Sequence, residues 1–245
     1  MNNILIVGST SGIAREIAKQ FAAHGYSLAL AGRDVEAVRQ QAAELATEYG
    51  TYAVAYPFEA LQFDRHQSLI DQVRTDCGEL EGLILCHGYL GDQHEAQQSM
   101  DESRRIFEIN FLSCVSLLNI VSTYLEARGH GFICALSSVA GDRGKRSNYI
   151  YGAAKGALTV YLQGLRHRLR PSGIHVVTVK PGFVDTRMTQ GMASIIPAAK
   201  PERVAKGIYW AIVKHKNTVY LPGYWRWIMG VLRCVPDFIF QKLSI

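Results

Sequence analysis

Residues 4–14 read Ile-Leu-Ile-Val-Gly-Ser-Thr-Ser-Gly-Ile-Ala, and a helical pattern follows over residues 15–23. The all-apolar run at residues 4–7 is typical of a β-strand that is buried on both faces of a sheet. A glycine-rich turn between such a strand and a helix presents backbone N–H groups and the positive end of the helix, which together can bind a pyrophosphate. The same turn also serves simple tight-turn packing, so this motif alone leaves both interpretations open.

The rest of the chain repeats the alternation of strand and helix. Further strands are predicted at 26–31, 51–56, 82–85, 132–136, 175–179 and 218–221, with helical patterns at 35–49, 65–77, 99–126, 147–170 and from 201 onward. This order predicts an α/β fold with a doubly wound, Rossmann-type parallel sheet of about seven strands flanked by helices. The amino-acid composition shows no abrupt change along the chain that would mark a domain boundary. We therefore expect one domain over residues 1–222, with residues 223–245 as a C-terminal tail of that domain.

Composition narrows the function classes. The 245 residues are 48% apolar with a net charge of +5, and no block of Lys and Arg indicates a nucleic-acid partner. The five cysteines form no Cys-x-x-Cys pair, so we expect buried free thiols in a reducing compartment and no metal site. The N-terminus lacks a positive leader and no apolar run reaches the ~18 residues of a membrane span, which predicts a cytoplasmic protein.

Three side chains suited to proton transfer converge in the second half of the sequence. Tyr151 and Lys155 are four residues apart in a predicted helix, so they share one face of it. Ser138 follows the apolar run at 132–136, and the three groups meet if that strand packs beside the helix. The cation is expected to lower the pKa of the phenol toward neutrality while the serine holds a substrate carbonyl oxygen. A Tyr-x-x-x-Lys motif by itself is more often a pair of surface residues. Whether it is catalytic here therefore depends on the other motifs in the sequence.

Those companions are Gly8-x-x-x-Gly12, Asn110 and Pro181-Gly182. Together with Ser138, Tyr151 and Lys155 they resemble the short-chain dehydrogenase/reductase family over nearly the whole chain. The resemblance implies an oxidoreductase that interconverts a ketone and a secondary alcohol. The resemblance further implies that Tyr151 donates the proton and that Lys155 holds the nicotinamide ribose and lowers the pKa of the phenol. It also implies that Ser138 binds the substrate oxygen and that Asn110 holds a water molecule beside the lysine.

The resemblance also implies a nicotinamide dinucleotide and a set of residues that bind it. Val7 and Ala14 depart from the family, which usually has threonine and a third glycine there, and residues 85–87 replace the usual Asn-Asn-Ala. We expect cofactor binding to survive because alanine is small enough for close helix packing. The expected contacts are Gly8, Thr10, Ser11, Gly12 and Ile13 at the pyrophosphate; Arg33, Glu59 and Ala60 at the adenosine; Cys86, His87, Gly88, Tyr151 and Lys155 at the riboses; and Pro181, Gly182, Val184 and Thr186 at the carboxamide.

The end of the second strand bears on the choice of cofactor. An acidic residue there binds the adenosine 2′-hydroxyl of NAD(H), whereas an arginine accommodates the 2′-phosphate of NADP(H). Gly32 occupies the acidic position and Arg33 follows it, which favours NADP(H). The alternative for Arg33 is a surface residue with no role in binding, which precedes Asp34, the predicted N-cap of the next helix. The alternative for Glu59 is a carboxylate in a surface loop that does not contact the adenosine.

Residues 223–245 hold two of the three tryptophans, together with Arg226, Arg233 and Lys242. This mixture suits a short interfacial helix that lies on the cytoplasmic face of a membrane, with cations near the lipid phosphates. The alternative is an arm that packs on the body of the protein or across a dimer interface. The family resemblance implies a homodimer or homotetramer.

A narrower resemblance concerns the substrate. Residues 146–148, 181–184, 187–189 and 191–192, with the tail, resemble the reductase components of decaprenylphosphoryl-ribose 2′-epimerases. That resemblance implies a 2-keto pentose carried on a polyprenyl phosphate, and we expect residues 187–199 to cover the substrate. The alternatives are a general reductase of soluble ketones, keto-acyl or steroid-like substrates, and a non-catalytic module that senses NADP.

Overall fold

The computed structural model describes residues 2–191 and 196–242, and within them one parallel sheet has seven strands. The strand order is β3-β2-β1-β4-β5-β6-β7, so the predicted doubly wound sheet is confirmed. The winding reverses between β1 and β4, and in such sheets ligands bind beyond the carboxyl ends of the strands at that point. The strands are β1 Asn3–Val7, β2 Ser27–Gly32, β3 Ala53–Pro57, β4 Leu80–Leu85, β5 Gly131–Leu136, β6 Ile174–Pro181 and β7 Thr218–Leu221.

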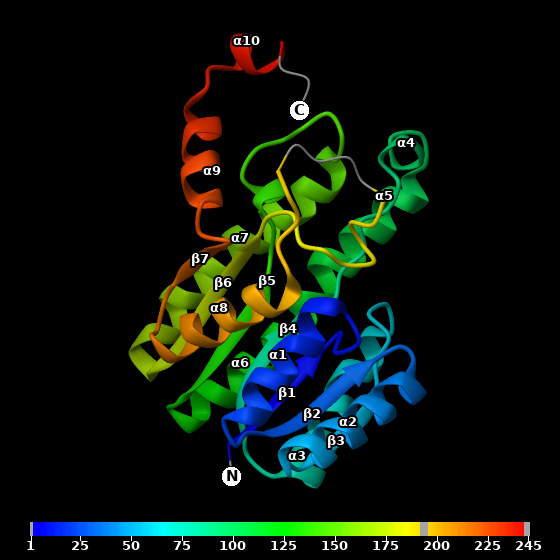
Figure 1. Cartoon of the computed structure of the whole chain (residues 1–245), viewed down its shortest axis with the longest axis vertical. Helices are drawn as coiled ribbons and strands as arrows, with labels where there is room; N and C mark the ends of the chain where they lie inside the picture. The colour runs from blue at the N-terminus through cyan, green and yellow to red at the C-terminus, as the bar shows by residue number, and fades with distance from the viewer. Residues whose placement is uncertain (1, 192–195, 243–245) are drawn as a thin grey trace.

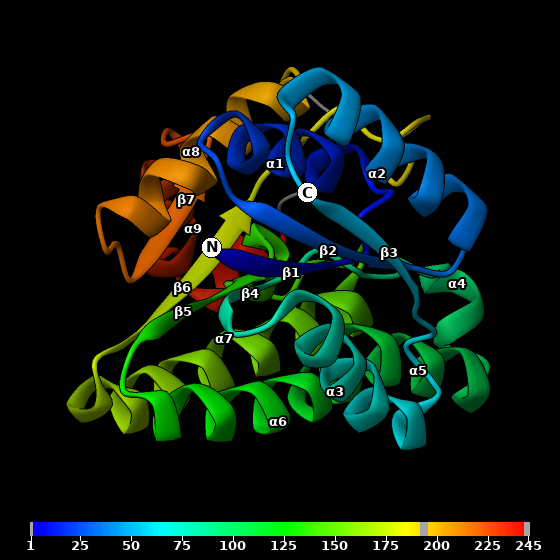
Figure 2. The same cartoon turned by 90° about the horizontal axis from the view of Figure 1, so that it is seen from below.

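Helices cover both faces of the sheet, as Figure 2 shows. On one face lie α1 Gly12–Ala23, α2 Val35–Tyr49 and α8 Pro201–Val213, and on the other α3 His66–Cys77, α6 Ser113–Arg128 and α7 Tyr149–Leu169. Alternate residues of a strand point to opposite faces. Ile4 and Ile6 therefore belong to one core and Leu5 and Val7 to the other, all fully buried. This is why residues 4–7 are apolar without interruption.

The long helix predicted at 99–126 is interrupted by a π-helical turn. Ser99 caps α5 Met100–Phe107 by accepting a hydrogen bond from the Glu102 amide (3.4 Å), as the sequence predicts. A π turn, Glu108–Leu112, then joins α5 to α6. Such turns hold one extra residue and often occur at functional sites. By length and composition the run Met100–Arg128 could cross a membrane, but half of its most apolar window is buried, and α6 packs between α3 and α7 as a core helix.

Small elements complete the described part of the chain. They are α4 Gln93–Ala96, the 3-10 turns Phe63–Arg65, Val139–Gly141 and Arg170–Ser172, and the tail helices α9 Trp225–Cys234 and α10 Asp237–Phe240. Figure 1 shows α9 and α10 projecting from the end of the molecule opposite the N-terminus. One face of α9 packs on the body, as one of the two interpretations of the tail predicts, through Trp225 and Met229 against Val139.

All five cysteines are free thiols, and three of them (Cys86, Cys114 and Cys134) are buried as predicted. Cys77 is half-buried. Cys234 is exposed, so the expectation of burial is wrong there. Cys234 is the last residue of α9. Like Trp227 and Val231, it is exposed on the side of the helix that faces away from the body.

Candidate active site

The glycine-rich turn after β1 is shaped by two close approaches. Gly8 has a φ of 77°, and a Cβ there would lie 2.6 Å from the backbone nitrogen of His87, so only glycine fits. A Cβ on Gly12 would meet the Cγ2 of Thr186 at 3.3 Å. Ser11 caps α1 by accepting from the Ala14 amide (3.3 Å). The turn therefore brings together the ends of β1 and β4, the start of α1 and the loop after β6.

The substitutions at residues 7 and 14 are accommodated in the core. The side chains of Val7 and Ala14 are fully buried, and Ala14 lies in the core between α1 and the sheet. Its methyl group needs no displacement of the glycine turn that precedes it. The turn at Gly8, Ser11 and Gly12 is thus compatible with alanine in the third position, and Thr10 and Ile13 lie within the same turn and first helical turn.

Glycines bring α7 against the turn that carries Ser138. A Cβ on Gly152 would lie 2.7 Å from the carbonyl oxygen of Ala140, and one on Gly141 would lie 2.7 Å from the amide of Gly156. Gly152 and Gly156 are four residues apart and therefore line one face of the helix. Their lack of side chains lets α7 approach the Val139–Gly141 turn closely. This contact places the neighbouring Tyr151 beside Ser138, and it brings Lys155 to the end of β5, where it donates to the Leu136 carbonyl.

Burial, and not the lysine, dominates the titration of Tyr151. The phenol is 8% exposed, and burial raises its pKa to about 12, although the hydrogen bond of the Ser138 hydroxyl acts in the opposite direction. The prediction that the ammonium lowers this pKa is therefore wrong for this structure. Lys155 Nζ lies 5.9 Å from the centre of the Tyr151 ring and donates to the Leu136 carbonyl at 2.9 Å. Desolvation by burial also lowers the pKa of Lys155.

Asn110 lies in the π turn and is fully buried, as its apolar neighbours predict. Its amide donates to the carbonyls of Tyr89 (2.6 Å) and Ile106 (2.8 Å), and its Oδ1 accepts from the Tyr89 amide (3.1 Å). A Cβ on Gly88 would meet Asn110 Oδ1 at 3.0 Å and Lys155 Nζ at 3.5 Å. Gly88 is thus the point where the predicted asparagine and lysine come together.

Cys86 and His87 do not present their side chains as predicted. The Cys86 thiol is part of the core beneath α1, and burial raises its pKa to about 12. His87 Nε2 pairs with the Ser113 hydroxyl (2.8 Å), its ring contacts Phe58, and its Nδ1 is enclosed without a hydrogen-bond partner among the described residues. Burial lowers the His87 pKa to about 3, which keeps the ring neutral. The backbone at these positions, beside Gly8, is what remains available to a cofactor.

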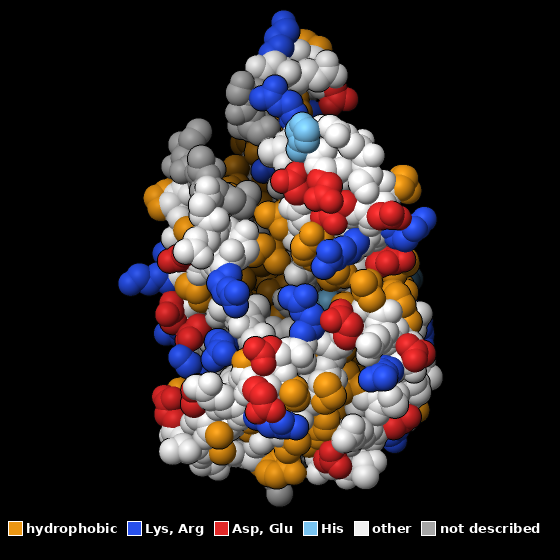
Figure 3. Space-filling model, turned by 90° about the vertical axis from the view of Figure 1, so that its right-hand side faces the viewer, with side chains coloured by type: hydrophobic (Ala, Val, Ile, Leu, Met, Phe, Trp, Pro, Cys, Tyr) orange, Lys and Arg blue, Asp and Glu red, His pale blue; other side chains and the backbone are white. Residues whose placement is uncertain are grey.

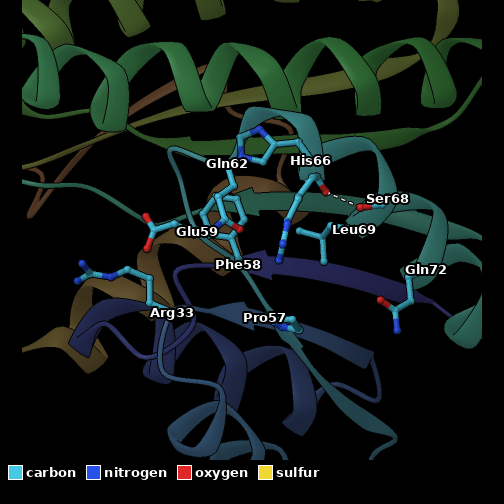
Figure 4. A pocket seen from close by; sticks show the side chains of 10 residues that line it. Arg33, Pro57, Phe58, Glu59, Gln62, His66, Ser68, Leu69 and Gln72 are labelled. Carbon is cyan, nitrogen blue, oxygen red and sulfur yellow. Dashed lines mark hydrogen bonds between the residues drawn. The ribbon is translucent and has the colours of Figure 1, made fainter.

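A cavity of about 390 Å³ lies beyond the ends of β2 and β3. Figure 4 shows Arg33 and Glu59 at one side of it, beside Phe58 and Gln62. Ala60 is instead buried in the core, so its side chain does not reach this cavity. Arg65 also lines the cavity, and sequence reasoning missed it because it lies at the start of a helix with no recognisable motif. The cavity therefore has two guanidinium groups on its walls.

The residue before Arg33 is a glycine, so no side chain stands next to Arg33 at the end of β2. A Cβ on Gly32 would meet Val38 Cγ2 at 2.9 Å, so any larger residue would need Val38 to move. With glycine here, this position carries no acidic side chain. Asp34 does cap α2, accepting from the Ala37 amide at 3.1 Å. The alternative reading of Arg33 as the residue before a helix cap is correct as far as it goes. The same arginine also lines the cavity, so the two interpretations are compatible.

The loop after β6 forms the far side of the site. Pro181 ends the strand, and a Cβ on Gly182 would overlap Trp225 Nε1, so the tail helix packs directly on this turn. Val184 bridges to Ala199, and the Thr186 amide donates to the Thr189 hydroxyl at 3.2 Å. Trp225 is a second residue that sequence reasoning missed, since only the fold brings it to Gly182.

The expected covering segment is described in part. Met188 extends over the site, since its Cε lies 3.8 Å from the Cβ position of Gly88. Residues 192–195 of the predicted segment, including one of its motif positions, lie outside the described residues. Figure 3 shows a hollow lined with hydrophobic side chains below the projecting tail. Among the residues that the structure describes, no group of three His, Cys, Asp or Glu side chains is placed to hold a metal ion.

A parallel sheet with its winding reversal at a glycine turn, and a buried tyrosine and lysine at the same edge, define the class of dinucleotide-fold oxidoreductases. The sequence model of the short chain dehydrogenase family matches residues 2–195. An uncharacterised oxidoreductase of Mycobacterium tuberculosis is 32% identical over 240 residues, which cover 98% of this chain and 96% of the relative. The chain therefore belongs to the short-chain dehydrogenase family.

Other relatives resemble the chain in sequence, and solved structures resemble it in fold. A ketoacyl reductase of Nostoc is 27% identical, over 88% of this chain and 76% of its own length. A short-chain dehydrogenase from Sphingobium yanoikuyae, solved in complex with NADPH, has a TM-score of 0.84 at 24% identity, with 97% of each chain covered. The actinorhodin polyketide ketoreductase with NADPH has a TM-score of 0.82 at 22% identity, over 91% of this chain and 96% of its own. These two structures share the fold.

Proposed function

We propose that this oxidoreductase uses NADP(H) to interconvert a ketone and a secondary alcohol. The observation that carries the proposal is the buried Tyr151, next to the Ser138 hydroxyl and one helical turn from Lys155. A phenol whose pKa is about 12 stays protonated at neutral pH, and a protonated donor is what reduction of a carbonyl requires. Asn110 meets Lys155 at Gly88, where the resemblance to the family places a water that resupplies the proton.

The residues present fit a dinucleotide. Gly8 and Gly12 form a cradle that side chains would fill, at the start of α1, and the cavity beside Arg33 and Arg65 offers two cations. When bound, the nicotinamide supplies a hydride to the substrate carbon. Lys155 would hold its ribose, Ser138 would donate a hydrogen bond to the substrate oxygen, and Tyr151 would give its proton to that oxygen. General acid catalysis of this kind is typically worth ~10²–10⁴-fold.

Three observations favour NADP(H) over NAD(H). Gly32 leaves no acidic side chain for an adenosine 2′-hydroxyl, and Arg33 and Arg65 line the adjacent cavity. An arginine matches the geometry of a phosphate by two parallel hydrogen bonds. The Sphingobium dehydrogenase and the actinorhodin ketoreductase, which share the fold, are both complexes with NADPH.

For the substrate we propose a lipid-linked keto-sugar. Residues 146–148 and 187–189 support it by their resemblance to the reductases of polyprenylphosphoryl keto-pentoses, and the hydrophobic lining of the hollow supports an apolar carrier (Figure 3). A keto-acyl or other soluble ketone is the second candidate, supported by the relative named as a ketoacyl reductase. A cytoplasmic homodimer or homotetramer is the state we propose for the enzyme. A non-catalytic sensor is the weakest candidate, because such a module would be expected to lose catalytic residue types and this sequence keeps Asn110, Ser138, Tyr151 and Lys155.

Consumption of NADPH and of NADH by the purified protein tests the proposal. The substrates are a short-chain polyprenylphosphoryl 2-keto-pentose, a β-keto-acyl thioester and simple cyclic ketones. We expect turnover with NADPH on the lipid-linked sugar. Turnover only with the thioester or simple ketones would replace the substrate, and turnover only with NADH would overturn the cofactor. Binding of NADPH with no turnover on any of them would identify a sensor and refute the proposed activity.

A further inference from the structure

Helix α9 is apolar on two opposite faces. Trp225 and Met229, one turn apart, are only 7% and 2% exposed and pack against Val139 on the body. Trp227 and Val231, also one turn apart, are 75% and 67% exposed. Surface helices normally turn polar residues outward. Trp227 is the most exposed large hydrophobic side chain that the structure describes, and packing within the fold does not explain it.

The short helix α10, which follows α9, also carries exposed apolar side chains. Phe238 and Ile239 on α10 are 69% and 44% exposed. We call Trp227, Val231, Phe238 and Ile239 the tail surface. A shallow cavity of about 410 Å³ runs along it, lined by Trp227, Ile228, Val231 and Leu232, all of them apolar. Exposed apolar side chains gathered along a groove in this way mark a site of interaction with a protein or a membrane.

Cations flank the tail surface. Arg226 and Arg233 are seven residues apart, so they lie on one flank of α9. The Arg233 side chain is also hydrogen-bonded to Tyr220 of β7, so it is partly engaged by the body of the protein. Lys242 follows α10. The Arg226 guanidinium lies 6.0 Å from the centre of the Trp227 ring. Asp237 is the acidic residue of this segment, and Arg143 neutralises it with an ion pair of 2.7 Å. Residues 224–242 therefore present an apolar strip with positive charge beside it.

The tail surface is held in a fixed orientation beside the active site. Arg143, five residues after Ser138, donates to the carbonyls of Leu232 (3.1 Å) and Arg233 (3.2 Å) at the end of α9 and lies 4.2 Å from the Phe240 ring centre. Trp225 contacts Gly182 on the other side of the site. The same segment thus packs on the catalytic loops with one face and presents an apolar, cation-flanked face outward.

We propose that the tail surface docks the protein on an anionic lipid membrane. Its aromatic and aliphatic side chains would enter the boundary between headgroups and acyl chains, and Arg226 and Lys242 would face the lipid phosphates. The projection of α9 and α10 beyond the body leaves this face accessible to a flat surface (Figure 1). A second copy of the chain fits less well, because a twofold contact sets the same cations opposite one another. An anionic surface complements them.

Vesicle binding by the full-length protein, without cofactor or substrate, tests the inference. We compare co-sedimentation with phosphatidylglycerol–phosphatidylcholine vesicles and with pure phosphatidylcholine vesicles, at low and high salt. The test variant is Trp227→Ser with Val231→Ser. The matched control is Trp210→Ser, which removes an exposed tryptophan (44%) from α8 on the body. Light scattering of each variant gives its oligomeric state, and NADPH-dependent reduction of a ketone shows that each remains folded.

We expect the wild type and Trp210→Ser to bind the anionic vesicles, more weakly at high salt. The double variant should bind at least about tenfold more weakly, because it loses two apolar anchors. Arg226→Gln should reduce the preference for anionic over neutral vesicles. Equal binding by the double variant and the wild type, or no binding of the wild type to any vesicle, would overturn the proposal. A double variant that changes only the oligomeric state would assign the surface to a second copy instead.

Discussion

Tyr151 shows how the environment of one residue sets its chemical role. The phenol is enclosed by α7 and the Ser138 turn, and burial raises its pKa to about 12. A raised pKa favours the neutral form of an acid. The phenol is therefore protonated over the whole physiological range, as its proposed role of proton donor requires. The direction of the reaction then determines how pH changes the rate.

The two directions should respond differently to pH. Reduction needs the protonated phenol, so its kcat should stay within about twofold from about pH 6 to about pH 9 as far as Tyr151 controls it. Oxidation needs the phenolate, so its kcat should rise with pH by up to about tenfold per unit below the pKa. Steady-state kinetics of a ketone and its alcohol over this range measure both. A steep fall of the reductive kcat near neutrality would show that the phenol titrates there, contrary to its burial.

The charge of Arg33 should determine cofactor preference. Arg33→Ala removes one of the two guanidinium groups from the cavity, so the Kd of NADPH should rise by about tenfold while that of NADH changes little. Arg39→Ala is the matched control, because Arg39 is exposed on α2 and pairs with Glu36 away from the cavity. Fluorescence titration with each nucleotide measures the shift. Equal loss of affinity for both nucleotides would place Arg33 elsewhere than at a 2′-phosphate.

At the scale of the element, glycines decide how α7 meets the Ser138 turn. Gly152→Ala would put a Cβ 2.7 Å from the Ala140 carbonyl, which the backbone can relieve only by moving the helix. We expect a loss of about 1–3 kcal/mol of unfolding free energy and a lower kcat. Urea denaturation and the rate of NADPH-dependent reduction measure the two effects.

Gly164→Ala provides the control on the same helix. A Cβ at Gly164 meets no atom within 4 Å, so this change should stabilise the protein by up to about 1 kcal/mol through helix propensity alone. Its kcat should remain that of the wild type. If Gly152→Ala were as stable and as active as Gly164→Ala, the close approach of α7 would have no part in forming the site.

The elements were largely predictable from the sequence, and the contacts between them were not. Period and turn chemistry predict β7 at residues 218–221 and α2 at 35–49 as they occur, because these signals are local. The Asn110 amide in the π turn hydrogen-bonds the Tyr89 carbonyl, which lies in another loop. The packing of His87 on Ser113 and of Trp225 on Gly182 likewise joins distant segments. No pattern within a window of sequence encodes such pairs.

At the scale of the whole molecule, buried histidines should make stability depend on pH. His87 has a pKa of about 3 in the fold because of burial, against an ordinary value near 6.5. Between these values the unfolded chain binds more protons than the folded one, so the free energy of unfolding falls as the pH falls. His66, fully buried and with its pKa lowered by the same cause, adds to this effect.

His87→Gln should therefore make the free energy of unfolding depend less on pH in the acidic range. It removes the titrating group and keeps a side chain that can pair with Ser113. The difference in Tm between about pH 7 and about pH 5 should be smaller than in the wild type. The exposed His94 supplies the control, His94→Gln, which should retain the wild-type difference. An unchanged difference in His87→Gln would show that other groups cause the acid sensitivity.

The most direct test of the whole account is Tyr151→Phe, which removes one hydroxyl and keeps the ring. We would measure NADPH affinity by fluorescence and ketone reduction under saturating NADPH on the same preparation. The prediction is a loss of about 10²–10⁴-fold in kcat, because the general acid is gone, with the Kd of NADPH within about threefold of the wild type. Wild-type turnover in Tyr151→Phe would contradict the account, because the proton would then come from another group.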